Sequence, residues 1–179
     1  SISLLKIAEK MKLENLTPEI NLKGIKVTLP DINRSALAMA GYFEHFEATR
    51  LQVIGFVEYS YVKRMSEKEE KEMLEKLLDY PIPGIIFCRE LHPDELFRQI
   101  AIEKGVPLLM TKRATSSFTA ELIRWLNVKL APCISVHGVL VDVYGEGVLI
   151  TGESGIGKSE AALELIKRGH RLVTDDVVE

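Results

Sequence analysis

The feature that most constrains the fold is a regular alternation of short apolar runs and helical segments between residues 51 and 131. We expect strands at three runs: LQVIGFVEY, PGIIFC and VPLLMT. We expect helices at three segments: SEKEEKEMLEKLLD, DELFRQIAIEKG and SSFTAELIRWLNVKLA. Strands that alternate with helices of this length form a parallel sheet with right-handed crossovers and helices on both faces. With an amphipathic helix expected over residues 4–13, residues 1–130 are predicted to form one α/β domain.

Composition narrows the class of protein and of partner. Of the 179 residues 46% are hydrophobic, which is typical of a globular protein. No stretch resembles a membrane span or a signal peptide, so we expect a cytoplasmic protein that does not bind membranes. A net charge of −3 gives no basic surface for nucleic acid. The two cysteines, Cys88 and Cys133, lie far apart in the sequence and are expected to be buried free thiols.

The pattern changes near residues 131–132, where we predict a domain boundary. The segment that follows, ISVHGVLVDVYGEGVLITG, contains two apolar runs joined by YGEG and is predicted to be a β-hairpin. Gly145 and Gly147 suit a tight turn that needs positive φ angles. Residues 131–179 are therefore predicted to begin a second domain.

A glycine-rich loop follows the hairpin. Its residues fit the pattern G-x-x-x-x-G-K-[ST] of a phosphate-binding loop (P-loop), with an apolar strand before it and a helical run after it. Glycines let backbone N–H groups surround phosphate oxygens, and the N-terminal end of the helix adds positive charge. We expect Lys158 to reach the terminal phosphates and Ser159 to ligate Mg²⁺. The predicted nucleotide-binding residues are Gly152, Glu153, Ser154, Gly155, Ile156, Gly157, Lys158 and Ser159.

Two adjacent carboxylates, Asp175 and Asp176, come at the end of the predicted strand RLVTDDV. An acidic residue at the carboxyl end of a strand commonly faces Mg²⁺ and phosphates in nucleotide-binding α/β folds. If the strand stays regular through both residues, only one side chain faces the site. The alternative is that the pair lies in a solvated turn after the strand.

His137 is the remaining candidate side chain. It alternates with Val139, Val141 and Val143 in the first run of the predicted hairpin. A histidine on an apolar face is typical of a hydrogen-bonded core residue, and a functional role is the alternative.

The segment from SVHG to the Asp-Asp pair resembles the opening of the catalytic domain of bacterial HPr kinase/phosphorylase. The His-Gly pair, the phosphate-binding loop and the Asp-Asp pair occur in the order and spacing of that family. The stretch AMAGYFEHFEATRLQVIG resembles the family's N-terminal domain, so the resemblance covers the whole chain. It implies an α/β domain at residues 1–130, followed at residues 131–179 by the beginning of a P-loop, phosphoenolpyruvate carboxykinase-like kinase domain.

The resemblance also implies an activity. The family transfers phosphate from ATP or pyrophosphate to a serine of HPr, a small phosphocarrier protein, and removes it by phosphorolysis that yields pyrophosphate. By resemblance, Asp176 is the general base for the HPr serine and the acid of the reverse reaction. His137 and Lys158 join it in the active site, Asp175 is the supporting carboxylate, and Ser159 binds Mg²⁺. A homo-hexamer, fructose 1,6-bisphosphate as an effector, and a role in carbon catabolite regulation are also implied.

The family's catalytic domain continues well past residue 179, so we expect the chain to be part of a larger polypeptide. The resemblance places a further Mg²⁺-binding acidic residue, the segment associated with phosphorylase activity and the regulatory helices beyond it. We therefore expect little activity from these residues alone. Two other functions stay open: another P-loop ATPase or small-molecule kinase, and a non-catalytic module for nucleotide binding or assembly.

Overall fold

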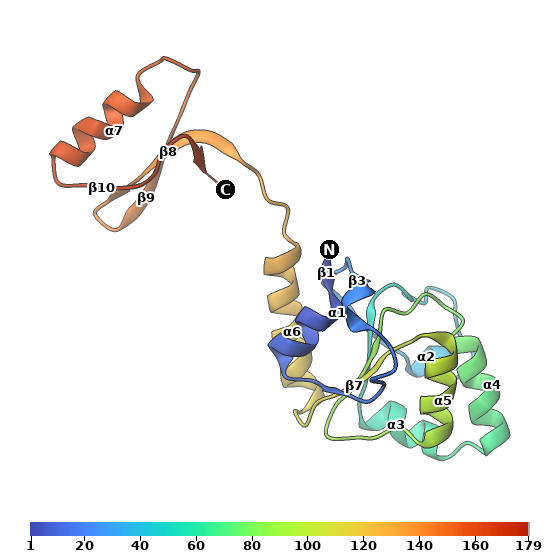
Figure 1. Ribbon diagram of the computed structural model, residues 1–179. Helices are drawn as coiled ribbons and strands as arrows, with labels where there is room; N and C mark the ends of the chain where they lie inside the picture. The colour runs from blue at the N-terminus through green and yellow to red at the C-terminus, as the bar shows by residue number, and fades with distance from the viewer. Residues whose placement is uncertain (179) are drawn as a thin grey trace. The chain divides into compact units, whose positions relative to one another are not determined.

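The computed structural model describes residues 1–178, which form two compact units that divide between Ala131 and Pro132 (Figure 1). Residue 179, the last of the predicted second domain, lies outside the described residues. Over the described part of the chain, no helix is both long and apolar enough to cross a membrane.

The first unit is built on a five-stranded sheet in the order β2-β7-β6-β5-β4. The strands are β2 (Glu14–Asn15), β4 (Ile32–Arg34), β5 (Leu51–Ile54), β6 (Ile85–Phe87) and β7 (Leu108–Met110). Strands β4 to β7 are parallel, which confirms the predicted parallel sheet, while β2 pairs antiparallel with β7 at one edge. A separate ribbon pairs β1 (Ile2–Ser3) with β3 (Lys26–Val27). Strands β2 and β4 and the ribbon are additions to the prediction.

Helices cover both faces of this sheet, as predicted. One core layer contains residues of α2 (Ala36–Met39), α3 (Phe56–Lys63), α4 (Glu67–Leu77) and α5 (Glu95–Lys104). The other contains residues of α1 (Leu4–Met11), the short 3-10 helix η1 (Leu22–Gly24) and α6 (Thr115–Leu130). Strand β6 serves both layers, because Phe87 packs in the first and Ile86 in the second. Burial on both faces explains why this strand is an unbroken apolar run.

One predicted strand is corrected. The run LQVIGFVEY is a strand only over β5, and helix α3 follows directly after Gly55. The N–H of Gly55 donates to the Glu58 carboxylate at 2.9 Å, and Arg34 donates to the same carboxylate at 2.8 and 2.6 Å. These bonds fix the first turn of α3 in a segment whose β-branched and aromatic residues favour a strand.

The second unit is an antiparallel sheet around β8 (Val136–Val143). Along one edge β8 pairs with β9 (Glu146–Thr151), which confirms the predicted hairpin. Along the other it pairs with β10 (Arg171–Thr174) and β11 (Val177–Val178). Helix α7 (Lys158–Lys167) contributes Ala162 to a small core with Val139 and Val141.

The hairpin turn differs from the prediction in one residue. Tyr144 (φ 54°) and Gly145 (φ 87°) have the positive φ angles that a two-residue turn of this kind requires. Gly147 instead lies in β9, opposite Asp142. The second positive φ therefore belongs to Tyr144, and the expectation for Gly147 is wrong.

The two cysteines have different environments. Cys88 is buried in the first unit, as expected, but Cys133 is exposed. Residues 131–135 belong to no helix or strand and are all exposed, so no apolar layer covers the Cys133 thiol. The prediction that both thiols are buried is therefore wrong for Cys133.

Candidate active site

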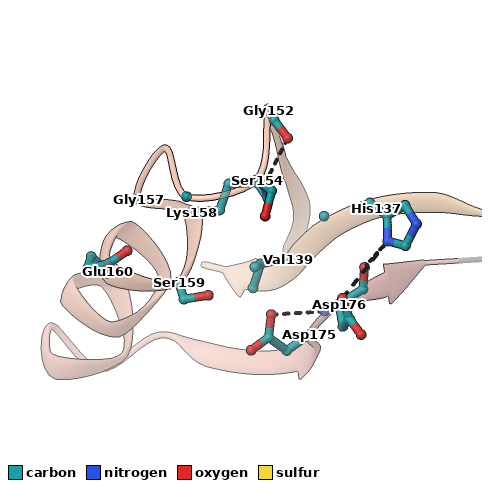
Figure 2. Close-up of a pocket in the computed structure, with 12 residues that line it drawn as sticks. His137, Val139, Gly152, Ser154, Gly157, Lys158, Ser159, Glu160, Asp175 and Asp176 are labelled. Atoms are coloured by element: carbon teal, nitrogen blue, oxygen red, sulfur yellow. Dashed lines mark hydrogen bonds and ion pairs between the residues drawn. The ribbon is translucent and has the colours of Figure 1, made fainter.

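The glycine-rich loop connects β9 to α7 (Figure 2). Gly155 (φ 81°) and Gly157 (φ 99°) have left-handed backbone conformations that glycine adopts without strain. Gly157 immediately precedes α7, and the first N–H groups of a helix have no acceptor within the helix. These N–H groups and the helix dipole favour an anion at this end of α7.

Lys158 and Ser159 are the first two residues of α7. The Nζ atom of Lys158 donates to the carbonyl oxygens of Gly152 and Glu153, at 2.8 Å each. The lysine side chain therefore follows the loop backward. Its ammonium charge is held beside the N-terminal end of the helix, where a phosphate would bind.

His137 and Asp176 meet where β8 and β11 begin. The Nδ1 atom of His137 lies 3.3 Å from the backbone oxygen of Asp176 and 3.9 Å from its Oδ1 atom. The side chains are 82% and 90% exposed. The interpretation of His137 as a core residue is therefore wrong, because the small core formed with Ala162 of α7 begins only at Val139.

The predicted strand RLVTDDV does not stay regular through its two aspartates. Strand β10 ends at Thr174, Asp176 has a φ of 82°, and β11 begins at Val177. The Oδ1 atom of Asp175 accepts the backbone N–H of Asp176 at 2.9 Å. Because of this kink both aspartates line the same cavity, instead of facing opposite sides of a strand.

A cavity of about 700 Å³ brings most of the predicted site residues together. These lining residues are His137, Gly152, Ser154, Gly155, Gly157, Lys158, Ser159, Asp175 and Asp176. Two loop residues from the prediction do not line it, Glu153 and Ile156. The side chain of Ile156 is exposed, and Glu153 takes part through the carbonyl oxygen that binds Lys158.

Three further residues line the cavity and were missed in the sequence: Gly138, Val139 and Glu160. A Cβ atom on Gly138 would lie 2.7 Å from the carbonyl oxygen of Ile150, so a side chain there would separate β8 from β9. The close pairing of β8 and β9 thus requires glycine at position 138. The His-Gly pair in the sequence could have indicated that Gly138 belongs to the site. Glu160, in the first turn of α7, carried no signal beyond the preference of acidic residues for that position.

Five side chains of the cavity carry oxygen atoms that could ligate a metal ion: Ser154, Ser159, Glu160, Asp175 and Asp176. Mg²⁺ prefers oxygen and binds through one or two carboxylates together with waters and substrate phosphates. Within residues 1–178 there is no group of three or more His, Cys, Asp and Glu side chains that could hold a metal ion. The oxygen atoms of this cavity suit a magnesium ion whose remaining ligands would be waters and phosphate oxygens.

Comparison with known families covers almost the whole chain. Residues 2–126 match the family described as HPr Serine kinase N terminus, and residues 128–179 match the HPr Serine kinase C-terminal domain. The chain belongs to the HPr serine kinase family. The resemblance seen in the sequence is thus confirmed at the level of the family, for both parts of the chain.

Curated relatives carry the name HPr kinase/phosphorylase. That of Lachnoclostridium phytofermentans is 58% identical over 179 residues, which are 100% of this chain and 58% of the relative. That of Caldanaerobacter subterraneus subsp. tengcongensis is 46% identical over 179 residues, covering 96% of this chain and 59% of the relative. The chain therefore spans less than two thirds of the length of these HPr serine kinase relatives.

Among solved structures, the CBS and DRTGG domains of the regulatory region of Clostridium perfringens pyrophosphatase show a distant likeness. The TM-score is 0.44 at 12% identity, covering 68% of this chain and 46% of that one.

Proposed function

We propose that the protein is an HPr kinase/phosphorylase, which phosphorylates a serine of HPr with ATP or pyrophosphate and removes that phosphate by phosphorolysis. One observation carries the proposal: the glycine-rich loop, His137 and both aspartates line a single cavity. The names of the relatives support the same reaction. A phosphate-binding loop alone would fit any ATPase, whereas a carboxylate across the same cavity adds a group that accepts a proton.

The loop would bind the phosphoryl donor and neutralise its charge. Phosphoryl transfer needs an aligned hydroxyl and stabilisation of negative charge on the phosphate oxygens, with little covalent help from the protein. The N–H groups at the start of α7 and the Lys158 ammonium supply that stabilisation. Ser159 with Asp175 or Asp176 would hold Mg²⁺, which supplies further positive charge to the phosphates when bound.

Asp176 would act on the serine hydroxyl of HPr. Its carboxylate is exposed and lines the cavity, so an incoming hydroxyl can reach it. In the forward direction Asp176 accepts the serine proton as the serine oxygen bonds to phosphorus. His137 contacts the backbone of Asp176, and Asp175 fixes its N–H, so both would position this carboxylate.

The same groups would serve the reverse direction. An oxygen of inorganic phosphate bonds to the phosphorus of phosphoserine, and the bond from phosphorus to the serine oxygen breaks. Protonated Asp176 returns its proton to that oxygen, and pyrophosphate leaves. A hexamer, the effector fructose 1,6-bisphosphate, a cytoplasmic location and carbon catabolite regulation stay predictions that rest on the resemblance.

The test is a radiolabel assay on the protein at the full length of its relatives. HPr is incubated with γ-labelled ATP and Mg²⁺, and inorganic phosphate is then added. We expect label on HPr in the first step and labelled pyrophosphate in the second. Failure to label HPr, with ATP hydrolysed or a small molecule labelled instead, would favour another P-loop enzyme.

Asp176→Asn tests the assigned base in the same protein. Both directions should fall by about a hundredfold or more while nucleotide binding is retained, because the amide cannot accept the proton. Glu146→Gln is the matched control, since this exposed carboxylate lies in β9 and does not line the cavity. Normal rates in Asp176→Asn would remove Asp176 from the mechanism.

A further inference from the structure

A second cavity, of about 260 Å³, lies in the first unit at the carboxyl ends of the parallel strands. Arg34 is the last residue of β4, Phe56 follows β5, and Arg89 follows β6, and all three line this crevice. Thr115 and Ser116, at the start of α6, also line it. Helices α3 and α6 belong to opposite core layers, so two helix N-termini open on one crevice. Ligands of open α/β sheets bind in crevices of this kind.

The guanidinium of Arg34 is held in a fixed position. Glu58, whose side chain is 3% exposed, accepts from Nε and Nη2 of Arg34 and from the N–H of Gly55. Burial raises the pKa of Glu58, but the bonds from Arg34 and Gly55 outweigh burial and leave the pKa below its ordinary value. Glu58 is buried whereas the Arg34 side chain is 41% exposed, so the ion pair fixes the position of the arginine and leaves its side chain accessible. Of the five N–H donors of arginine, three have no acceptor among residues 1–178.

Arg89 supplies a second positive charge to the crevice. It makes no salt bridge to any described residue and is exposed. Its φ of 60°, followed by 59° at Glu90, is an uncommon conformation for residues other than glycine. Burial raises the pKa of the Cys88 thiol, while the charges of Arg34 and Arg89 both act to lower it. Arg34 and Arg89 thus bring two guanidinium groups to the lining of one crevice.

Gly55 lets these groups converge. A Cβ atom at this position would lie 2.8 Å from the Oγ1 atom of Thr115 and 2.9 Å from Nη2 of Arg34. The Thr115 hydroxyl and the Arg34 guanidinium therefore both lie where a side chain at position 55 would be. Ala114, which precedes α6, provides no side-chain cap, so the first N–H groups of α6 are available to a ligand.

We propose that this crevice binds the phosphate group of a small phosphate monoester. The planar guanidinium of Arg34, with its unused donors, can bind two phosphate oxygens at once. Further hydrogen bonds to the phosphate can come from Arg89, from the hydroxyls of Thr115 and Ser116, and from the N–H groups at the start of α6. Glu58 is the one carboxylate bonded to Arg34, and its charge is balanced by that arginine. The site belongs to the first unit and is independent of the reaction proposed for the second.

The test is a titration of the ¹⁵N-labelled 179-residue protein, followed through its amide signals. The probes are AMP and ribose 5-phosphate, with adenosine as the matched compound that lacks phosphate. We expect both phosphates, but not adenosine, to shift the amides of Gly55, Thr115 and Ser116 in a saturable way. Signals of residues 152–159 report binding at the glycine-rich loop separately.

Two arginine variants complete the experiment. Arg89→Ala should weaken binding at the crevice by about tenfold or more, because a charge-assisted hydrogen bond is lost. Arg64→Ala, which removes an exposed arginine outside the crevice, should bind like the unchanged protein. Shifts confined to residues 152–159, equal shifts with adenosine, or equal affinity of the two variants would each overturn the proposal. Since the Arg89 side chain makes no bond to described residues, its removal should leave the fold intact.

Discussion

The two units differ in how their candidate binding groups are supported. In the first unit two apolar layers enclose a parallel sheet, and the arginines of the crevice lie at or just after the ends of strands that those layers hold in place. In the second unit the core consists of Val139, Val141 and Ala162, and the cavity is built from a loop and a kink between strands. Substitutions in the core layers of the first unit should therefore act mainly on stability, and substitutions of the residues that line the second unit's cavity should act mainly on binding and chemistry.

The largest expected effect is on the stability of the first unit. Phe118 of α6 is fully buried, and Phe118→Ala should lower the free energy of unfolding by about 3–5 kcal/mol. Urea unfolding followed by the fluorescence of Trp125, which packs against the same layer, measures this. Leu37→Ala is the control, because Leu37 is mostly exposed and its loss should cost less than about 0.5 kcal/mol. Equal effects would contradict the assigned core.

The next prediction is a loss of activity without a loss of stability. In the protein at the full length of its relatives, Lys158→Met should lower the rate of phosphoryl transfer by about 10²–10³-fold, because a positive charge is lost beside the transferred group. The unfolding transition of the first unit should not move. Lys167→Met, at the other end of α7, is the matched control and should keep normal rates. If Lys158→Met lowered the stability of the first unit as well as the activity, the proposed division between stability in the first unit and chemistry in the second would be wrong.

A smaller effect concerns pH. Burial, then the hydrogen bond and charge of Asp94, raise the pKa of Glu70 from 4.5 to about 8, while Lys63 acts in the opposite direction. Folding therefore favours neutral Glu70. This stabilisation is complete below pH 4.5 and is lost as the pH rises toward about 8.

Glu70→Gln should remove this dependence of the free energy of unfolding on pH. At about pH 9 the variant should be more stable than the unchanged protein by about 1–3 kcal/mol, since a buried charge is no longer formed. Urea unfolding across this pH range, with Trp125 as the probe, measures the difference. Glu72→Gln alters an exposed carboxylate of the same helix and should leave the slope unchanged. Parallel slopes for Glu70→Gln and the unchanged protein would contradict the raised pKa.

The smallest change needs no variant. A thiol reagent added to the folded protein should modify Cys133 and leave Cys88 unmodified, because only Cys133 is exposed and burial raises the pKa of Cys88. Peptide mass spectrometry identifies the labelled cysteine. Both should react in denaturant. Rapid labelling of Cys88 in the folded protein would mean that the layer around β6 opens easily.

The sequence predicted the architecture of the first unit better than its details. Apolar alternation was sufficient for the parallel sheet and the helices on both faces, because burial on a strand leaves a local pattern. It was not sufficient for the start of α3, because the local bond from Gly55 to Glu58 is supplemented by bonds from Arg34, which lies 24 residues from Glu58 in the sequence. Nothing in the local pattern of LQVIGFVEY records that partner.

The candidate site likewise has features that could be predicted from the sequence and features that could not. The loop motif was visible because its glycines meet a local demand, the positive φ angles at Gly155 and Gly157. The exposure of His137 and the kink at Asp176 were not visible, because they depend on where α7 and β11 lie against β8. Alternation assigned His137 to a face of its strand but could not say what covers that face.

The bonds of Lys158 have a consequence for how tightly the loop can bind a ligand. The ammonium already donates to the carbonyl oxygens of Gly152 and Glu153, so a phosphate that engages it must exchange with them. The observed affinity is then the difference between two sets of hydrogen bonds. Such an exchange favours ligands of high negative charge, because a neutral or singly charged group gains too little from the lysine to displace the two carbonyls. We therefore expect the loop to bind weak anions poorly, because Lys158 already donates to two carbonyl oxygens of the loop.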